Sequence, residues 1–124
     1  MALLNFRNKD GATASAPQSL EGILAGYSIE VMPRTAEKVE DFRALLPKGT
    51  RVYIAHIDGT PFDEMLATAK RLSAEGYTPM PHFPARTIPD RATLADWIAR
   101  YQGEAGVTEG LILAGGIPAA HGEY

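Results

Sequence analysis

The sequence predicts an α/β protein built on a mainly parallel sheet. Four short apolar runs, at residues 27–32, 51–57, 77–83 and 110–113, begin 24, 26 and 33 residues apart. Segments with helical periodicity lie between these runs, and strand–helix alternation at such an interval is typical of right-handed βαβ units. The length of 124 residues fits a single domain of ordinary size.

The chain is expected to begin with a flexible arm over residues 1–18, which are rich in Gly, Ala, Ser and Thr and lack periodicity. The domain itself is then expected over residues 19–124. A short helix near residues 19–25 precedes the first strand.

The first two connections between strands carry helix signals. Residues 35–46 (TAEKVEDFRALL) begin with Thr35 as a cap and repeat apolar residues on one face. The second connection has Thr60 as N-cap and Pro61 at the first helical position, and Gly76 ends it. We therefore expect a continuous helix in each connection.

The pattern of the third connection predicts a helix that begins near Asp90. Four of its apolar positions share one face: Leu94, Trp97, Ile98 and Tyr101. The strand before this helix contains Pro79 and Pro81, which is unusual for a central strand because each proline lacks a backbone donor.

Composition excludes several classes of function. Lys and Arg number 12 against 15 Asp and Glu, a net charge of −3 without a basic cluster, which argues against nucleic-acid binding. No apolar run approaches the ~20 residues of a membrane-spanning helix, and the first residues do not resemble a signal peptide, so a cytoplasmic protein without membrane contact is expected. The absence of cysteine excludes disulfides, thiolate nucleophiles and zinc sites with sulfur ligands.

Chemistry is expected at the carboxyl ends of the strands, where sites form in parallel α/β folds. The polar or glycine residues found there are Glu30, His56, Asp58, His82, Arg86, Gly115 and Gly116. A glycine pair lets the backbone approach a flat ring or a phosphate closely, although it is also a plain turn.

Glu30 is flanked by apolar residues inside the first strand. A carboxyl held in a dry site stays protonated near neutral pH and can act as a general acid, whereas a solvent-facing residue of an alternating strand is the alternative. His56 and Asp58 are two residues apart and therefore face one side of their strand. With His82 and Glu30 they could bind a metal through nitrogen and oxygen, or hydrogen-bond a ligand or the backbone.

Four strand-end motifs, in the order SIEVMPR, RVYIAHIDG, MPHFPAR and LILAGGIP, resemble the first half of methylenetetrahydrofolate reductases. Those enzymes are flavin-dependent TIM barrels with motifs similar to S-x-E-F-F-P-P, P-H-L-T-C and L-R-G-D-x-P. The resemblance covers about residues 26–118. It implies the TIM (β/α)8 barrel family, with this chain supplying about the first four βα units, so that residues 19–124 form the first half of a flavin-dependent barrel domain.

The resemblance also implies a reaction. The implied substrate is a folate, and the implied enzyme interconverts 5,10-methylene- and 5-methyl-tetrahydrofolate in one-carbon metabolism and methionine biosynthesis. Glu30 corresponds to the acidic residue that protonates the folate nitrogen during ring opening.

The implied cofactor is FAD. His82 corresponds to a histidine that contacts the flavin, and Gly115 to a glycine whose backbone runs close to it, between Ala114 and Gly116. His56 and Asp58 lie where the loop after the second strand approaches the cofactor.

Several positions differ from the family pattern. Ala114 and Gly116 replace the Arg and Asp of L-R-G-D, Ala55 replaces a threonine, and residues 83–85 replace L-T-C. These changes favour the hypothesis that the flavin is reduced by methyl-tetrahydrofolate rather than by NADH or NADPH, so that the reaction runs in the oxidative direction.

A barrel of this type has eight βα units in about 250 residues. Four units leave two open sheet edges and an exposed inner face, so we expect either a homo-oligomer or the remainder of a longer chain to cover them. Two alternatives remain open: a metal-dependent hydrolase of barrel type that uses His56, Asp58, His82 and Glu30, and a non-catalytic α/β module that binds a partner through its open edge.

Overall fold

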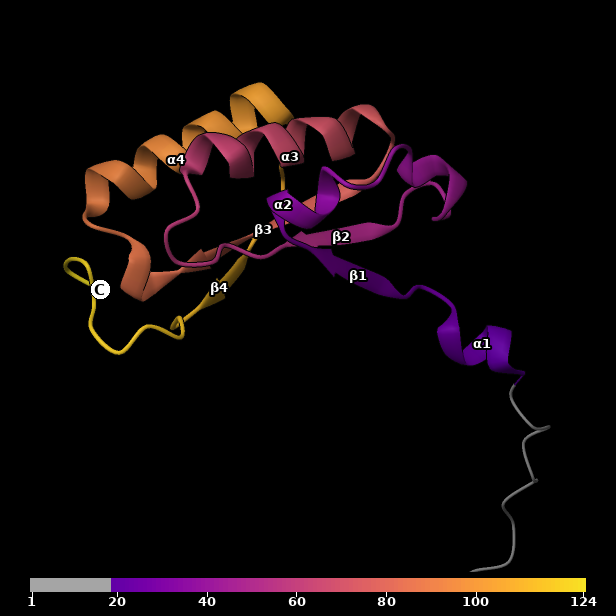
Figure 1. Cartoon of the computed structure of the whole chain (residues 1–124), viewed down its shortest axis with the longest axis horizontal. Helices are drawn as coiled ribbons and strands as arrows, with labels where there is room; N and C mark the ends of the chain where they lie inside the picture. Colours follow the sequence, from indigo (N-terminus) through magenta and orange to yellow (C-terminus); the bar gives the residue numbers. More distant parts are fainter. Residues whose placement is uncertain (1–18) are drawn as a thin grey trace, which may run out of the picture.

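The computed structural model describes residues 19–124, and the arm expected over residues 1–18 lies outside that range. Its centre is a four-stranded sheet in which neighbouring strands are parallel and follow the order β1-β2-β3-β4 (Figure 1). The strands are β1 (Ser28–Val31), β2 (Arg51–Ile54), β3 (Thr78–Pro84) and β4 (Leu111–Leu113). The expectation of a parallel sheet alternating with helices is confirmed.

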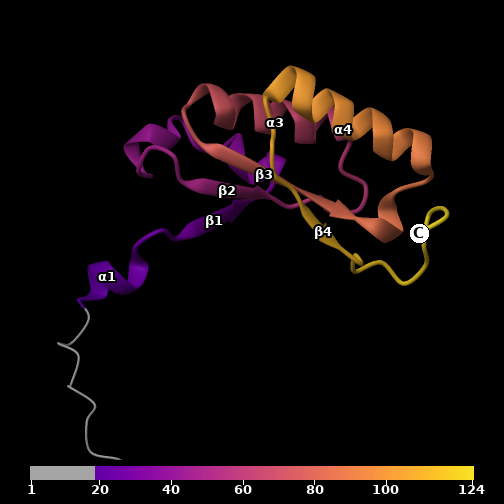
Figure 2. The same ribbon diagram turned by 180° about the vertical axis from the view of Figure 1, so that it is seen from behind.

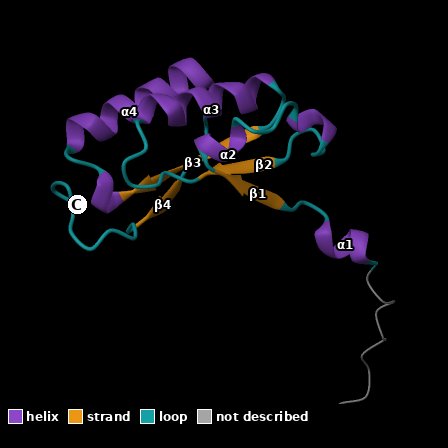
Figure 3. Cartoon of the chain, viewed as in Figure 1, coloured by secondary structure: helices purple, strands orange, loops and turns teal. Residues whose placement is uncertain are grey.

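Two long helices lie on one face of this sheet. They are α3 (Phe62–Ala74) and α4 (Arg91–Ala105), and Figures 1 and 2 show both helices on the same side of the strands. The shorter helices are α1 (Leu20–Leu24) and α2 (Pro33–Ala36), with single 3-10 turns η1 (Phe42–Ala44) and η2 (Ala85–Thr87) in the connections (Figure 3). The sheet therefore has one covered face, under α3 and α4, and one open face.

The core lies between the covered face and the two long helices. Alternation along β2 turns Val52 and Ile54 toward the helices, and both are fully buried. An aromatic group joins α3 to α4, with Phe62 stacked on Trp97 at 5.0 Å and set edge-on against Tyr101. Of the apolar stripe expected on the third helix, Trp97 and Tyr101 thus pack against α3, and Tyr101 also contacts Phe83 of β3, whereas Ile98 is exposed.

The two prolines of β3 fit a central strand because of where β4 begins. The amide of Thr78 donates to the Thr50 carbonyl on the β2 side, so the alternate positions Pro79 and Pro81 turn their nitrogens toward β4. β4 pairs with β3 only from His82 onward. The missing donors therefore fall on a stretch of β3 that β4 does not reach.

The prediction of a continuous helix over residues 35–46 is wrong. This segment forms α2, which already ends at Ala36, and the separate turn η1. The reason is Arg71 of α3, whose guanidinium donates to the carbonyls of Ala36, Val39 and Glu40 at 2.9, 2.6 and 3.1 Å. A side chain thus takes acceptors that a continuous helix would use.

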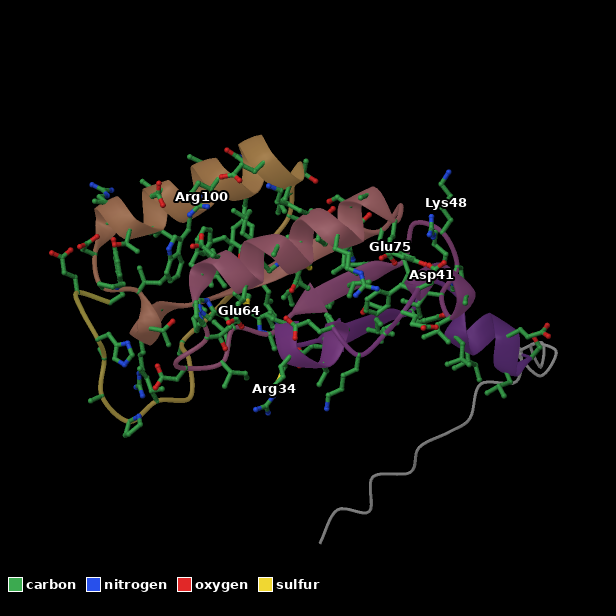
Figure 4. The ribbon with its side chains drawn as sticks, turned by 45° about the horizontal axis from the view of Figure 1, so that its top comes forward. Arg34, Asp41, Lys48, Glu64, Glu75 and Arg100 are labelled. Carbon is green, nitrogen blue, oxygen red and sulfur yellow. The ribbon has the colours of Figure 1, made fainter. Side chains whose placement is uncertain are left out.

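Glu75 completes this arrangement at the end of α3. Its carboxylate accepts from Arg71 Nε at 2.7 Å and from the Phe42 amide at 3.1 Å, while the Arg71 guanidinium lies over the Phe42 ring. Figure 4 labels Glu75 beside Asp41, where the segment passes the end of the helix. Asp41 itself accepts from the Arg43 amide and begins η1.

The other helix boundaries are close to expectation. α3 has Pro61 as its N-cap, one residue after the expected Thr60. Asp90 caps α4 by accepting from the Thr93 amide at 2.7 Å, and Gly106, at φ +63°, ends that helix. Within residues 19–124, no helix has the length and apolar character that crossing a membrane requires.

Candidate functional site

The open face carries the residues expected to perform chemistry on β1 and β3. Register places Glu30 beside Tyr53 and Tyr53 beside Met80, and residues in register share a face. His82 is two residues after Met80 and lies on the same face. The polar groups of the sheet therefore face away from α3 and α4.

Glu30 and His82 meet across the intervening strand. Glu30 Oε2 lies 3.3 Å from His82 Nε2. The side chain of His82 is only 11% exposed, against 58% for Glu30. The contact does not have hydrogen-bond geometry, so the buried Nε2 has no hydrogen-bond partner among residues 19–124. This nitrogen has almost no exposed surface, so a ligand on the open face would reach it only if the Glu30 side chain moved aside. Glu30 itself is too exposed for the dry site that the sequence predicted.

A second charged pair lies on the open face nearer the amino ends of the strands. Arg51 at the start of β2 contacts Glu109, just before β4, at 2.9 Å. Both pairs join strands that are two apart in the sheet, β1 with β3 and β2 with the approach to β4. On the open face, these charged pairs therefore join elements that are two apart in the sheet.

His56 does not join this group, because its ring packs against Trp97 of α4, on the covered side. Its Nε2 lies 3.1 Å from the Thr60 carbonyl, which can only accept, so Nε2 carries the hydrogen. The ring sits 5.2 Å from that of Trp97, and within the described residues the buried Nδ1 has no partner. Burial lowers the pKa of His56, although the bond to the Thr60 carbonyl opposes that shift.

Asp58 lies apart from Glu30 and His82. Its carboxylate is 3.5 Å from Nε2 of His121, near the carboxyl terminus. Asp58 lines a hollow of about 350 Å³ with Arg34, Thr60 and Glu64, at the carboxyl ends of β1 and β2. Sequence reasoning missed His121 because it belongs to no periodic element or motif.

The glycine turn after β4 packs against the end of β3. Gly115 has φ +94°, and a Cβ there would lie 3.3 Å from Cβ of Pro84, so the position favours glycine for backbone reasons. The carbonyl of Ala114 accepts from the Arg86 amide at 3.0 Å, and Arg86 Nη1 donates to the Ile117 carbonyl. The turn is thus fixed to β3 at the carboxyl end of the sheet, with Ala114 and Gly116 exposed.

The four residues considered as metal ligands separate into different places. Glu30 and His82 meet on the open face, His56 lies against Trp97, and Asp58 pairs with His121. Over residues 19–124, no group of three or more His, Asp or Glu side chains is close enough to hold a metal ion.

Another hollow lies away from these residues. It measures about 450 Å³ and is formed at the amino ends of the strands by residues such as Lys48, Thr50 and Arg51. Sites in parallel α/β folds form at the opposite end, so we assign this hollow to loop packing.

No protein-family model matches the chain. The open face carries the groups that could perform chemistry. It brings together an exposed carboxylate and a buried imidazole, and a glycine turn lies beyond them, against Pro84 and Arg86 at the carboxyl end of the sheet. Such a set can hold a flat polar ligand and exchange a proton with it.

Proposed function

We propose that this chain is the first half of a flavin-dependent (β/α)8 oxidoreductase that resembles methylenetetrahydrofolate reductases and interconverts 5,10-methylene- and 5-methyl-tetrahydrofolate. The observation that carries the proposal is the 3.3 Å approach of Glu30 to His82 on the open face. These are the two residues that the resemblance assigns to proton transfer and to flavin contact. They belong to motifs more than fifty positions apart, so their meeting supports a common site.

The arrangement of the open face supports the barrel half of the proposal. In a TIM barrel, interior side chains form layers that come from alternate strands. The pairs Glu30–His82 and Arg51–Glu109 have that pattern, because each joins elements two apart. All four strands are also parallel and in sequential order, as in a barrel of this kind.

The residues present suit a flavin in part. The Nε2 of His82 could bond a polar ring atom once the Glu30 side chain moved aside, and the turn at Ala114–Gly116 offers backbone without bulky side chains. A bound flavin would supply the hydride acceptor or donor. His82 and the glycine turn would orient it, and they would hold its ring on the open face.

Glu30 handles the proton in this proposal. Its exposed carboxyl would donate a proton to the folate nitrogen in the reductive direction and take it back in the oxidative direction. Ala114 and Gly116 bring no charge to the cofactor, whereas the family pattern has Arg and Asp there. This difference supports oxidation of methyl-tetrahydrofolate as the direction of the reaction.

The test is the substitution Glu30→Gln in the full chain supplied with FAD. Oxidation of methyl-tetrahydrofolate needs a group that takes up the folate proton, so loss of the Glu30 carboxylate is expected to lower turnover of methyl-tetrahydrofolate by about 10²–10⁴-fold. Binding of FAD, followed by quenching of its fluorescence, is expected to stay near that of the wild type. Glu37→Gln is the matched control, because Glu37 is exposed at the end of α2. Turnover by Glu30→Gln at the wild-type rate would show that Glu30 is not the acid.

The direction is tested by anaerobic stopped-flow reduction of the flavin-loaded chain. Methyl-tetrahydrofolate is expected to reduce the flavin faster than NADH or NADPH does. Faster reduction by either nicotinamide would contradict the oxidative direction while leaving the role of Glu30 in place.

A further inference from the structure

Most of the exposed large apolar side chains of residues 19–124 belong to the two edge strands or to segments next to them. In the segment that leads into β1 they are Leu20, Ile23, Leu24 and Tyr27. Beside β4 they are Ile98, Leu111, Ile112 and Tyr124. The remaining two, Leu45 and Ile57, lie in connections. Apolar surface of this kind, concentrated at unpaired edges, marks an interface.

The β4 edge carries an apolar groove. Its volume is about 340 Å³, and its walls include Phe83 of β3, Leu94 and Ile98 of α4, and Ile112 of β4. Ile112 pairs in register with Phe83 and shares its side of the sheet, yet its side chain is 83% exposed. The groove is therefore a part of the covered face that α4 borders but leaves uncovered.

The groove continues toward the amino end of β4. A smaller hollow of about 140 Å³ is formed there by residues that include Ile98, Tyr101 and Val107. Together the two hollows run along the outer side of β4 beside α4. A segment that ran beside β4 would cover both.

The β1 edge carries an apolar helix without a neighbour to cover it. All five residues of α1 are exposed, and Leu20, Ile23 and Leu24 have the spacing of one helix face. Figure 1 shows α1 standing away from the body of the sheet, at the amino end of β1. Ile29 and Val31 of β1 are only half-buried on the covered side.

We propose that a second copy of the chain occupies this groove. The β1 edge of one copy pairs in parallel with the β4 edge of the other, and α1 covers the amino-terminal part of the groove. A two-fold axis repeats the contact at the remaining two edges. Two parallel four-stranded sheets thereby close into one eight-stranded barrel without open edges.

A second copy suits both edges because each edge holds what the other lacks. β4 has a groove that needs an apolar segment at the amino end of its neighbour strand, and β1 has such a segment in α1. Pairing also sets Ile29 and Val31 beside the exposed Ile112. The open face becomes the interior, so Glu30 and His82 of one copy face strands of the other.

The experiment is sedimentation equilibrium of the full chain and of two edge variants. The wild type is expected to be a dimer. Ile112→Glu and Ile23→Glu each place a charge in the proposed contact. Both isoleucines are more than 60% exposed, so neither substitution removes a buried side chain. Each is expected to weaken dimerisation by at least about 30-fold. Leu45→Glu is the matched control, because Leu45 is 66% exposed but lies at neither edge, and it should remain a dimer.

Mixing the two variants tests which edges meet. Ile112→Glu keeps an intact β1 edge and Ile23→Glu keeps an intact β4 edge, so a mixture can form one undamaged contact. The other contact then carries both charges, and a contact already disrupted by one charge loses little more from a second. The mixture is therefore expected to dimerise more strongly than either variant alone. Dimerisation of Ile23→Glu at wild-type strength would overturn the proposal in favour of β4 meeting β4, and a monomeric wild type would overturn it altogether.

One further measurement and a second pair of variants guard against misfolding. Circular dichroism establishes that each variant is folded, and Ile112→Ser and Ile23→Ser replace any variant that is not. The readout is mass, which does not depend on FAD or folate, so its outcome is separate from that of the proposed reaction.

Discussion

The covered and open faces of the sheet are made by the same four strands but carry different residues. Along β2, Ile54 is fully buried under α3 and α4, whereas its neighbour Tyr53 faces the open side and is half-buried. Apolar packing fills one face, and charged pairs such as Glu30–His82 lie on the other. Because successive side chains of a strand point to opposite faces, the residues that stabilise the fold lie on one face and those available for chemistry lie on the other.

Ile54→Ala and Tyr53→Ala test this division most strongly. Ile54→Ala leaves a cavity in the core and is expected to lower the free energy of unfolding by about 3 kcal/mol. Tyr53→Ala removes mainly the edge-on contact with the His82 ring and is expected to cost about 1 kcal/mol. Urea denaturation measures both at a protein concentration low enough to dissociate a dimer. Equal losses would mean that the open face is packed as firmly as the covered one.

The Arg71 cluster extends the covered face into the connection after α2. Arg71→Met removes the donors to the Ala36 and Val39 carbonyls and leaves the largely buried Glu75 without its cation. We expect a loss of about 2–3 kcal/mol, measured by urea denaturation. Arg43→Met is the control. It removes an exposed pair with Asp41 and is expected to have no measurable effect, even though this pair lowers the pKa of Asp41.

Two tyrosine hydroxyls on the covered side are expected to respond in opposite directions. Tyr101 is buried, its hydroxyl has no partner within residues 19–124, and burial raises its pKa so that it stays protonated. Tyr101→Phe should therefore raise the free energy of unfolding by up to about 1 kcal/mol, because no hydrogen bond is lost. Tyr77→Phe loses a hydrogen bond to the Leu46 carbonyl and should lower the melting temperature. A melting temperature that falls equally in both variants would indicate a partner for Tyr101.

The smallest expected effect is a pH dependence from His56. Because burial lowers its pKa in the folded protein, the unfolded chain binds the proton more readily. Stability is therefore highest above the ordinary value of 6.5 and falls as the pH drops from there toward the lower folded pKa. His56→Phe should flatten this part of the profile of unfolding against pH, whereas His121→Gln, at an exposed position, should retain it. An unchanged profile in His56→Phe would assign the dependence to other groups.

Much of the fold could be predicted because its signals are local. Each strand lies within or close to the apolar run that predicts it, and Asp90 caps its helix through a residue three positions away. The break in the helix expected over residues 35–46 could not be predicted, because it depends on Arg71, some thirty positions further along. Local periodicity carries no information about a distant guanidinium.

The residues of the candidate site likewise divide into those whose position could be predicted from the sequence and those whose position could not. Glu30 and His82 could be expected at one end of a parallel sheet, and they meet there. His56 and Asp58 have strand-like spacing, but β2 ends at Ile54, so alternation no longer governs them. Their partners, Thr60 and His121, come from a loop and from the end of the chain. Such pairings depend on loop conformation, which residue spacing does not encode.

The prolines of β3 have a consequence for synthesis of the chain. Until residues 111–113 have emerged, β3 is the outer strand of a three-stranded sheet, and its free edge faces other nascent chains. Pro79 and Pro81 remove two donors from that edge, so a passing strand finds no continuous ladder to extend. Prolines at such an edge disfavour pairing with a foreign strand, and β4 itself pairs only with the carboxyl end of β3, beyond the two prolines.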